Sequence, residues 1–225
     1  MDLKKFVSLL EKNELFFSSI INMEDEYEGS IPLRNAAKRF RNLNHLPTKN
    51  KDQFLHDLSN LQHNFRSSIY INCWHLSQNE SVAMWKIYSK NDEGIAIKTN
   101  ISRLKSSITD PRRVFLSKVN YIDYSHQAFS EYNALPSVLH KRKEFAYENE
   151  LRLLTDGVME NHSHSVENKD LSGINIKVDI NNLIDEIYIS PFSVPWLQEL
   201  VSNLCKQYSL DKCVMASSLN VKPIF

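Results

Sequence analysis

Glycine is scarce in this chain, with four residues among 225. Loops that cradle a phosphate need clustered glycines, because only a residue without a Cβ lets the backbone approach the ligand closely. Neither the GxGxxG pattern nor the Walker A pattern occurs. The sequence therefore excludes a glycine-rich phosphate loop as a way of binding a nucleotide.

Cysteine is also rare. The chain contains Cys73, Cys205 and Cys213, and their spacing shows no pairing. An odd number of widely spaced cysteines fits free thiols in a reducing compartment and not a disulfide framework. The metal-binding patterns CxxC and HExxH are absent as well. We therefore predict a cytoplasmic location and no metal site.

Long apolar runs are missing too. Residues 1–6 lack the apolar stretch of a signal peptide. No segment reaches the roughly 20 consecutive apolar residues that a membrane-spanning helix needs. We therefore expect no contact with a membrane.

The chain has no net charge, because 27 Lys and Arg residues balance 27 Asp and Glu residues. This balance argues against a strongly basic nucleic-acid binder, so a nucleic acid is not indicated as a partner. A local basic patch can still exist within a neutral total. Arg34, Lys38 and Arg41 would form one if the fold gathers them.

The composition is that of an ordinary folded protein, with 42% hydrophobic and 24% charged residues. A chain of this length can bury one substantial core, and no stretch has the composition of a linker between domains. We therefore predict a single domain over residues 1–225. Both a monomer and a homodimer stay open, and a protein partner is unknown.

Hydrophobic periodicity alternates between the helical and the extended pattern along the chain. Helical spacing covers residues 6–10 and most of 32–66, where the polar segment 47–52 predicts a loop. Ser77 and Glu80 have the capping-box spacing that predicts a helix start before Trp85. β-Branched and aromatic residues predict strands at 15–19, 69–74, 95–99 and 119–124.

The C-terminal third predicts a strand at 186–190, a helix at about 194–207 and a strand at 213–216. A crossover of this length normally joins two parallel strands into a right-handed β-α-β unit. Residues 159–170 have no apolar periodicity and predict a loop. Together the patterns predict a mixed α/β fold with a central mixed sheet flanked by helices.

The most informative polar cluster is the hexapeptide Tyr147–Arg152. If it is a strand, alternation places Glu148, Glu150 and Arg152 on one face. The guanidinium would then keep one carboxylate ionised and leave the other to bind a hydroxyl or accept a proton. If it is a helix, Glu148 and Arg152 form an ordinary i,i+4 pair. Spacing alone leaves a catalytic site and a solvated salt-bridge strip equally open.

Two charged segments carry candidate ligand-binding residues. The acidic turn at 24–28 offers Asp25 and Glu28, which could bind a hard cation, although its spacing does not match a calcium loop and such turns are usually solvated. Lys141 opens a short basic run directly before the carboxylate pair. Such runs are usually solvated, but this one could bind phosphate.

Trp85 and Tyr88 lie at helical spacing, where the usual role of aromatic residues is core packing. A buried tyrosine hydroxyl requires a hydrogen-bond partner. On that ground Tyr88 is a candidate catalytic residue. Trp85 is a candidate ligand contact only through its place in an ordered set of motifs that includes Asp25, Glu28, Tyr88 and Lys141.

Several short motifs occur in a fixed order, and together they resemble one family. They are Leu15-Phe16-Phe17-Ser18, Asp25-Glu26-Tyr27-Glu28-Gly29, Cys73-Trp74-His75, Glu80-Ser81, Met84-Trp85, Val119-Asn120-Tyr121, His140-Lys141-Arg142 and Glu148-Asn149-Glu150-Leu151-Arg152. The set is similar to the bacterial family known as domain of unknown function 2971 (DUF2971), over about residues 6–217. That family has no established activity, so the resemblance implies a shared fold and shared positions and not a reaction.

Glu148-Asn149-Glu150 has the Glu-x-Glu form of arginine-directed ADP-ribosyltransferases. By that analogy the protein would be an enzyme acting on a nucleotide such as NAD, through ADP-ribosyl transfer or glycohydrolysis. Glu150 would hold a ribose hydroxyl and stabilise an oxocarbenium-like state, and Glu148 would position the acceptor. Tyr88 would stack on the nicotinamide.

Two other hypotheses stay open. The first is a non-catalytic ligand- or partner-binding module, as part of a bacterial stress or phage-defence system, with Tyr147–Arg152 recognising the ligand or locking the fold. The second is a metal-dependent nuclease that uses Asp25, Glu28 and Glu150. The neutral charge and the lack of a metal motif count against the nuclease.

Overall fold

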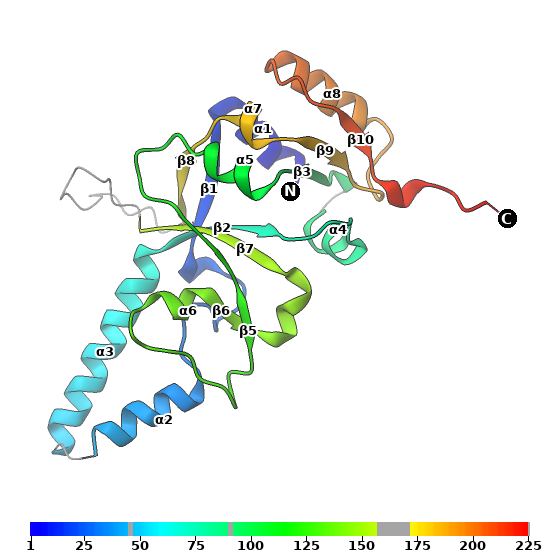
Figure 1. The fold of residues 1–225 in the computed structure, drawn as a ribbon. Helices are drawn as coiled ribbons and strands as arrows, with labels where there is room; N and C mark the ends of the chain where they lie inside the picture. The colour runs from blue at the N-terminus through cyan, green and yellow to red at the C-terminus, as the bar shows by residue number, and fades with distance from the viewer. Residues whose placement is uncertain (45–46, 90–91, 157–171, 225) are drawn as a thin grey trace. The chain divides into compact units, whose positions relative to one another are not determined.

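The computed structural model describes residues 1–44, 47–89, 92–156 and 172–224 (Figure 1). The chain divides into two compact units. Unit 1 consists of Met1–Leu15, Ser77–Asp110 and Asn175–Phe225, and unit 2 consists of Phe16–Leu76 and Pro111–Ile174. Each unit is thus assembled from segments that are distant in the sequence. The single domain over residues 1–225 stays a prediction, and the loop expected at 159–170 lies outside the described residues.

Unit 1 is built around a three-stranded sheet in the order β10-β9-β3. β10 (Val214–Ala216) runs parallel to β9 (Glu186–Ile189), and β3 (Ile95–Lys98) runs antiparallel to β9. Helix α8 (Leu197–Gln207) joins β9 to β10 and buries one side chain in every four (Figure 1, orange). The predicted C-terminal β-α-β unit is therefore confirmed. Unit 1 also contains α1 (Leu3–Lys12), α4 (Val82–Tyr88), α5 (Ile101–Ser106), α7 (Ile180–Leu183) and the 3-10 turn η4 (Ser218–Asn220).

Unit 2 holds most of a five-stranded sheet in the order β4-β7-β2-β1-β8. Its middle strand pairs are antiparallel: β7 lies between β2 and β4, and β2 also pairs with β1. The strands are β1 (Glu14–Ser19), β2 (Tyr70–His75), β4 (Phe115–Lys118), β7 (Glu150–Thr155) and β8 (Gly173–Lys177). The mixed α/β class is confirmed, with the strands divided among several sheets.

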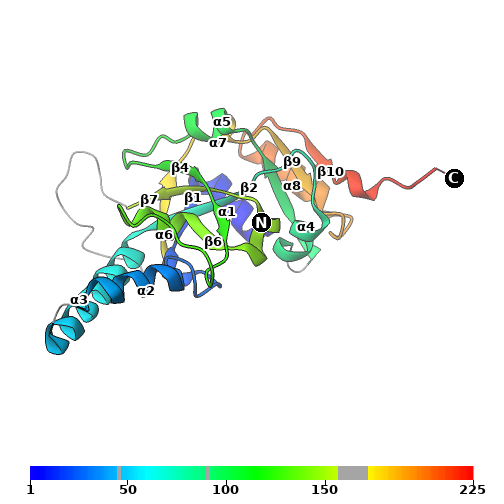
Figure 2. The ribbon, with the colours of Figure 1, turned by 60° about the horizontal axis from the view of Figure 1, so that its bottom comes forward.

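The remaining elements of unit 2 include two long helices and a small parallel strand pair. Helices α2 (Leu33–Asn42) and α3 (Thr48–Ser68) lie next to each other in both views (Figure 1, Figure 2). β5 (Asn120–Ile122) pairs in parallel with β6 (His140–Arg142). Unit 2 also contains the 3-10 turn η1 (Ile20–Asn22), helix α6 (Leu135–Leu139) and the 3-10 turn η3 (Lys143–Glu148).

One face of β7 carries both an apolar core and a charged cluster. Every residue of β7 is buried, and strand alternation places Glu150, Arg152 and Leu154 on the same face. Leu154 lies opposite Ile71 of β2 and packs in a core with Ile20, Ile69, Ile71 and Val138. Arg152 and Glu150 continue the same face beyond that core. The alternation of one strand therefore sets a polar cluster directly beside a hydrophobic cluster of unit 2.

Two local predictions were wrong. The loop expected at 47–52 forms the first turn of α3, which begins at Thr48 directly after Pro47. Proline suits a helix start, since its fixed φ matches the helix and its missing N–H has no partner there anyway. The polar residues that follow are therefore solvent-facing helix and not loop.

The capping box at Ser77 and Glu80 was also misplaced. Helix α4 begins at Val82, and the Ser81 hydroxyl accepts a hydrogen bond of 3.3 Å from the Met84 N–H. Ser77 instead donates to the carbonyl of Asn79 within a local turn. Serine favours both a cap and a turn because its hydroxyl reaches nearby backbone groups, and here Ser81 forms the cap and Ser77, four residues earlier, forms the turn.

Candidate functional site

Three candidate side chains converge because the chain turns sharply between β6 and β7. Lys141 is the middle residue of β6, Glu148 ends the 3-10 turn η3, and Glu150 begins β7. Asn149 between them adopts a left-handed conformation with φ 41°, which asparagine tolerates better than most residues. This turn brings the side chains of Glu148 and Glu150 back to Lys141, seven and nine residues earlier in the chain.

Lys141 is the shared cation of the site. Its ammonium donates to Glu148 Oε2, to Glu150 Oε1 at 2.7 Å, and approaches Glu28 Oε1 at 3.4 Å. It also lies 4.7 Å from the centre of the Phe145 ring, a favourable position over an aromatic face. One buried ammonium therefore holds three carboxylates together.

Arg152 is the second cation, and its side chain is fully buried. Its two terminal nitrogens bind Glu28 in a bidentate pair at 2.9 and 2.8 Å, and its Nε donates to Glu150 Oε2 at 2.6 Å. A further bond of 2.8 Å goes to the backbone carbonyl of Val138. Arg152 thus uses four of the five donors of a guanidinium. In this arrangement it orients Glu28 and Glu150.

A second ion pair fixes the acidic turn beside this cluster. Arg142 binds Asp25 through two hydrogen bonds of 3.1 and 2.8 Å, and its guanidinium lies over the rings of Tyr27 and Phe145. The Asp25 carbonyl accepts from the Glu28 N–H at 2.9 Å. The turn predicted as solvated is therefore held by Arg142 at Asp25 and by Arg152 at Glu28.

Burial and charge move the pKa values of Glu148 and Glu150 in opposite directions. Burial, together with a hydrogen bond to Glu150, raises the pKa of Glu148 to about 7 despite the nearby Lys141. Burial also opposes ionisation of Glu150, but the Arg152 charge and hydrogen bonds from Glu148 and Arg152 hold its pKa well below the usual range. A pair of carboxylates whose environments separate their pKa values can divide the acid–base and electrostatic roles of a reaction.

Tyr121 also belongs to the site, although the sequence did not predict it as a site residue. Its hydroxyl accepts a hydrogen bond of 2.8 Å from the Glu150 N–H. Burial raises the pKa of Tyr121 to about 12 against that hydrogen bond, so the phenol stays protonated near neutral pH. The pairing of Tyr121 with Lys141 across β5 and β6 places it here. Only the motif Val119-Asn120-Tyr121 hinted at its importance.

The predicted site residues are distributed over both units. Unit 2 brings together Asp25, Glu28, Lys141, Glu148, Glu150 and Arg152. Trp85 and Tyr88 belong to α4 of unit 1. Trp85 is buried and its indole N–H donates to Glu80 at 2.9 Å, whereas Tyr88 is half exposed. Trp85 therefore has the burial of a core residue.

Within the described residues, no group of three His, Cys, Asp or Glu side chains is arranged to hold a metal ion. In the same part of the chain, no helix has both the length and the apolar character needed to span a bilayer.

Part of this site lies in a segment that matches a known protein family. A family model described as a protein of unknown function, DUF2971, matches residues 84–153. This segment of the chain is similar to the DUF2971 family. The matched DUF2971 segment contains Lys141, Glu148, Glu150 and Arg152, and it excludes Asp25 and Glu28. Neither the curated proteins nor the solved structures gave a match.

Proposed function

We propose that this protein is an enzyme that acts on the glycosidic bond of a nucleotide such as NAD, by transfer or by hydrolysis. The observation that carries the proposal is the pair Glu148 and Glu150, which share one ammonium while their pKa values move in opposite directions. Reactions with an oxocarbenium-like transition state commonly use two carboxylates in distinct roles.

The two carboxylates have separate tasks in this reaction. The bond between the ribose C1′ and the nicotinamide nitrogen breaks, and its electron pair leaves with the nicotinamide. Glu150, which Arg152 keeps ionised, binds a ribose hydroxyl and stabilises the positive charge that develops on the sugar. Water or an acceptor group then attacks C1′ and loses a proton to Glu148. A base with a pKa near 7 is well matched to that step at neutral pH.

The positions of Lys141, Arg152 and Tyr121 suit supporting roles. Lys141 holds the two carboxylates at one point, and Arg152 fixes the orientation of Glu150 from the buried side. Tyr121 binds the backbone N–H at the start of β7. Each of these residues acts through Glu148 or Glu150, so we assign them to positioning.

The test measures nicotinamide release from NAD by wild type, Glu148→Gln and Glu150→Gln, with and without arginine-containing acceptors. Glu144→Gln is the matched control, because Glu144 is an exposed residue of the same turn η3. We expect release by wild type and by the control, and a loss of at least about a hundredfold in both site variants. The activity of wild type should rise with pH through about 7.

One observation favours a second candidate, a non-catalytic ligand- or partner-binding module. Glu148 and Glu150 are 6% and 5% exposed, and ion pairs buried to this degree also occur as purely structural clusters. Under this alternative, wild type releases nicotinamide at background, and Glu150→Gln lowers only the melting temperature. The nuclease hypothesis gains no such support, because Asp25, Glu28 and Glu150 each bind an arginine of the chain.

A further inference from the structure

The neutral net charge of the chain conceals a strongly basic segment. Residues 29–51 contain Lys and Arg at six positions and neither Asp nor Glu. Four of these cations lie in helix α2, which has no acidic residue. Clustering of one sign of charge on a single element is the usual electrostatic mark of a surface that binds a polyanion.

Three of the α2 cations share one side of the helix. Arg34, Lys38 and Arg41 follow one another at spacings of four and three residues, so they form a continuous row along the axis. All three are exposed. We call this row the basic face of α2. Successive members are separated by about 6 and 4.5 Å along the helix axis. Long, flexible Lys and Arg side chains at these separations can reach successive phosphates of a nucleic-acid backbone.

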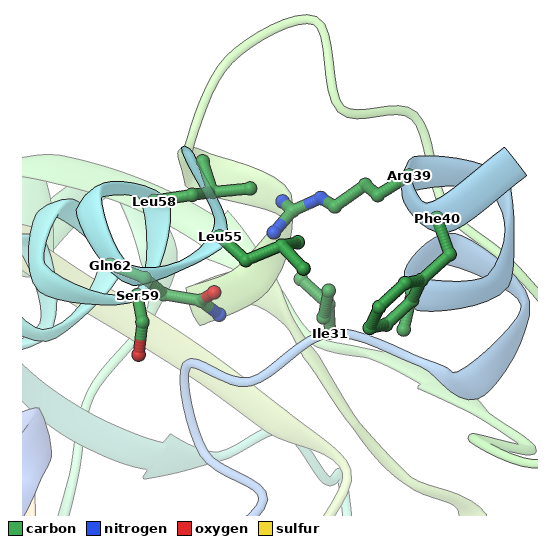
Figure 3. A pocket seen from close by; sticks show the side chains of 8 residues that line it. Ile31, Arg39, Phe40, Leu55, Leu58, Ser59 and Gln62 are labelled. Carbon is green, nitrogen blue, oxygen red and sulfur yellow. The ribbon is translucent and has the colours of Figure 1, made fainter. Parts of the chain in front are cut away.

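The opposite side of α2 is already occupied by α3. Ala36, Arg39 and Phe40 line a hollow together with Leu55 and Leu58 of α3 (Figure 3). With 3.6 residues per turn, this lining lies about half a turn away from the basic face. Packing against α3 therefore leaves Arg34, Lys38 and Arg41 directed away from the helix pair.

The cations of the basic face also lack partners within the described residues. Arg39, on the side facing α3, forms an ion pair with Glu131. No such pair is formed by Arg34, Lys38 or Arg41 in the part of the chain that the structure describes. Their charge is thus available to an external anion.

We propose that the basic face of α2 binds the phosphate backbone of a nucleic acid, without regard to base sequence. A row of Lys and Arg is the donor set that contacts backbone phosphates. The only apolar side chain between these cations on the same side is that of Ala37. Protein interfaces normally need large aromatic or aliphatic side chains at their centre, and this face has none.

The experiment measures binding of a fluorescent random-sequence 30-base-pair DNA duplex, and of its single strand, by the full chain across a range of salt concentrations. The test variant is Arg34→Gln/Lys38→Gln/Arg41→Gln. The matched control is Lys4→Gln/Lys5→Gln/Lys12→Gln, which changes the net charge equally at exposed positions of α1. Vesicles containing phosphatidylserine are tested in parallel, because Leu33 and Phe40 are exposed elsewhere on α2 and make an anionic membrane the competing partner.

We expect wild type and the α1 control to bind at low salt with similar affinity. The α2 variant should bind at least about tenfold more weakly. The negative slope of log K against log salt should become shallower by about 2 to 3, because each lost phosphate contact reduces the size of the slope by about 0.9. Equal losses in both triple variants would reduce the effect to total charge and overturn the proposal. Binding to the vesicles without binding to either DNA would overturn it in favour of a membrane surface.

Discussion

At the scale of single residues, the central feature is a set of charges that lie out of water. Glu28, Glu148 and Glu150 face Lys141 and Arg152 in a cluster with little access to solvent. Removing water from a charge is costly, and only the opposite charge and the hydrogen bonds repay that cost. Each member of the cluster therefore depends on the others, and a single substitution leaves an unmatched charge.

Arg152 offers the sharpest test of this dependence. Arg152→Met removes the bidentate partner of Glu28 and the Nε bond to Glu150, which leaves two buried carboxylates without their guanidinium. We expect the free energy of unfolding to fall by about 3–5 kcal/mol. Lys143→Met is the control, because its ion pair with Asp123 is half exposed and should contribute at most about 1 kcal/mol. Urea unfolding measures both, and equal effects would contradict the prediction.

Glu148 predicts a dependence of stability on pH. Burial and the bond to Glu150 raise its pKa from the ordinary 4.5 to about 7 in the folded chain. Between these values the native state holds more protons than the unfolded state, so the free energy of unfolding falls as the pH rises. Glu148→Gln removes this titration. As the pH rises from about 5 to about 8, the free energy of unfolding of this variant should therefore increase relative to that of wild type by about 1–3 kcal/mol. A difference that stays constant over this range would show that the titration is absent.

At the scale of elements, strand alternation accounts for most of what could be anticipated about the site. It correctly placed Glu150 and Arg152 on one face of a strand. Alternation also predicted Glu148 on that face, but Glu148 is not part of the strand. It ends a 3-10 turn and joins the cluster because Asn149 has a left-handed conformation. The helical alternative, an i,i+4 pair of Glu148 and Arg152, was wrong. A local reversal of φ has no periodic signature in a sequence, so it could not be predicted.

The start of helix α4 allows a test at this scale. Ser81→Ala removes the hydroxyl that accepts from the Met84 N–H, and loss of an N-cap costs about 0.5–2 kcal/mol. Ser77→Ala is the natural comparison, because Ser77 was the cap expected from the sequence and makes only an exposed turn. Thermal unfolding of the two variants should show the larger decrease for Ser81→Ala. The reverse order would restore the capping box at Ser77 and Glu80.

Glu80 shows how a residue can fit a motif and serve another purpose. Its carboxylate accepts from the Trp85 indole and from the hydroxyls of Ser217 and Ser218, and also from the Ser218 N–H. These bonds tie α4 to the turn after β10, within unit 1. The bonds from Ser217 and Ser218 join residues more than 130 positions apart, and local spacing does not predict them.

At the scale of the whole molecule, both units are formed from separated segments of the chain. In unit 2, β7 pairs with β2 along its full length although some 75 residues lie between them. Sheet pairing over such distances is invisible to periodicity, because it depends on which strands can bury their faces against each other. The order β4-β7-β2-β1-β8 therefore had to come from the structure.

This arrangement predicts that the chain does not fold in halves. A break after Asp110 separates β2 from β7 and β4, and it also divides β3 from β9 in unit 1. We expect fragments 1–110 and 111–225, each expressed alone, to lack a cooperative thermal transition. Mixing or co-expressing them should restore it. A fragment that unfolds cooperatively by itself, measured by circular dichroism, would contradict this prediction.

The sequence by itself determined the mixed α/β class and the C-terminal β-α-β unit, and it pointed to Tyr147–Arg152 as the candidate cluster, because periodicity and residue chemistry are local properties. The scarcity of glycine likewise excluded phosphate loops without any structure. Only the tertiary structure decided that Asp25 and Glu28 meet Arg142 and Arg152, that Tyr121 joins them, and that Arg34, Lys38 and Arg41 remain exposed on one face. These outcomes depend on which side chains the fold brings together and which it leaves exposed. Packing and the cost of desolvating charges decide this between residues that are distant in the sequence, so no local sequence pattern predicts it.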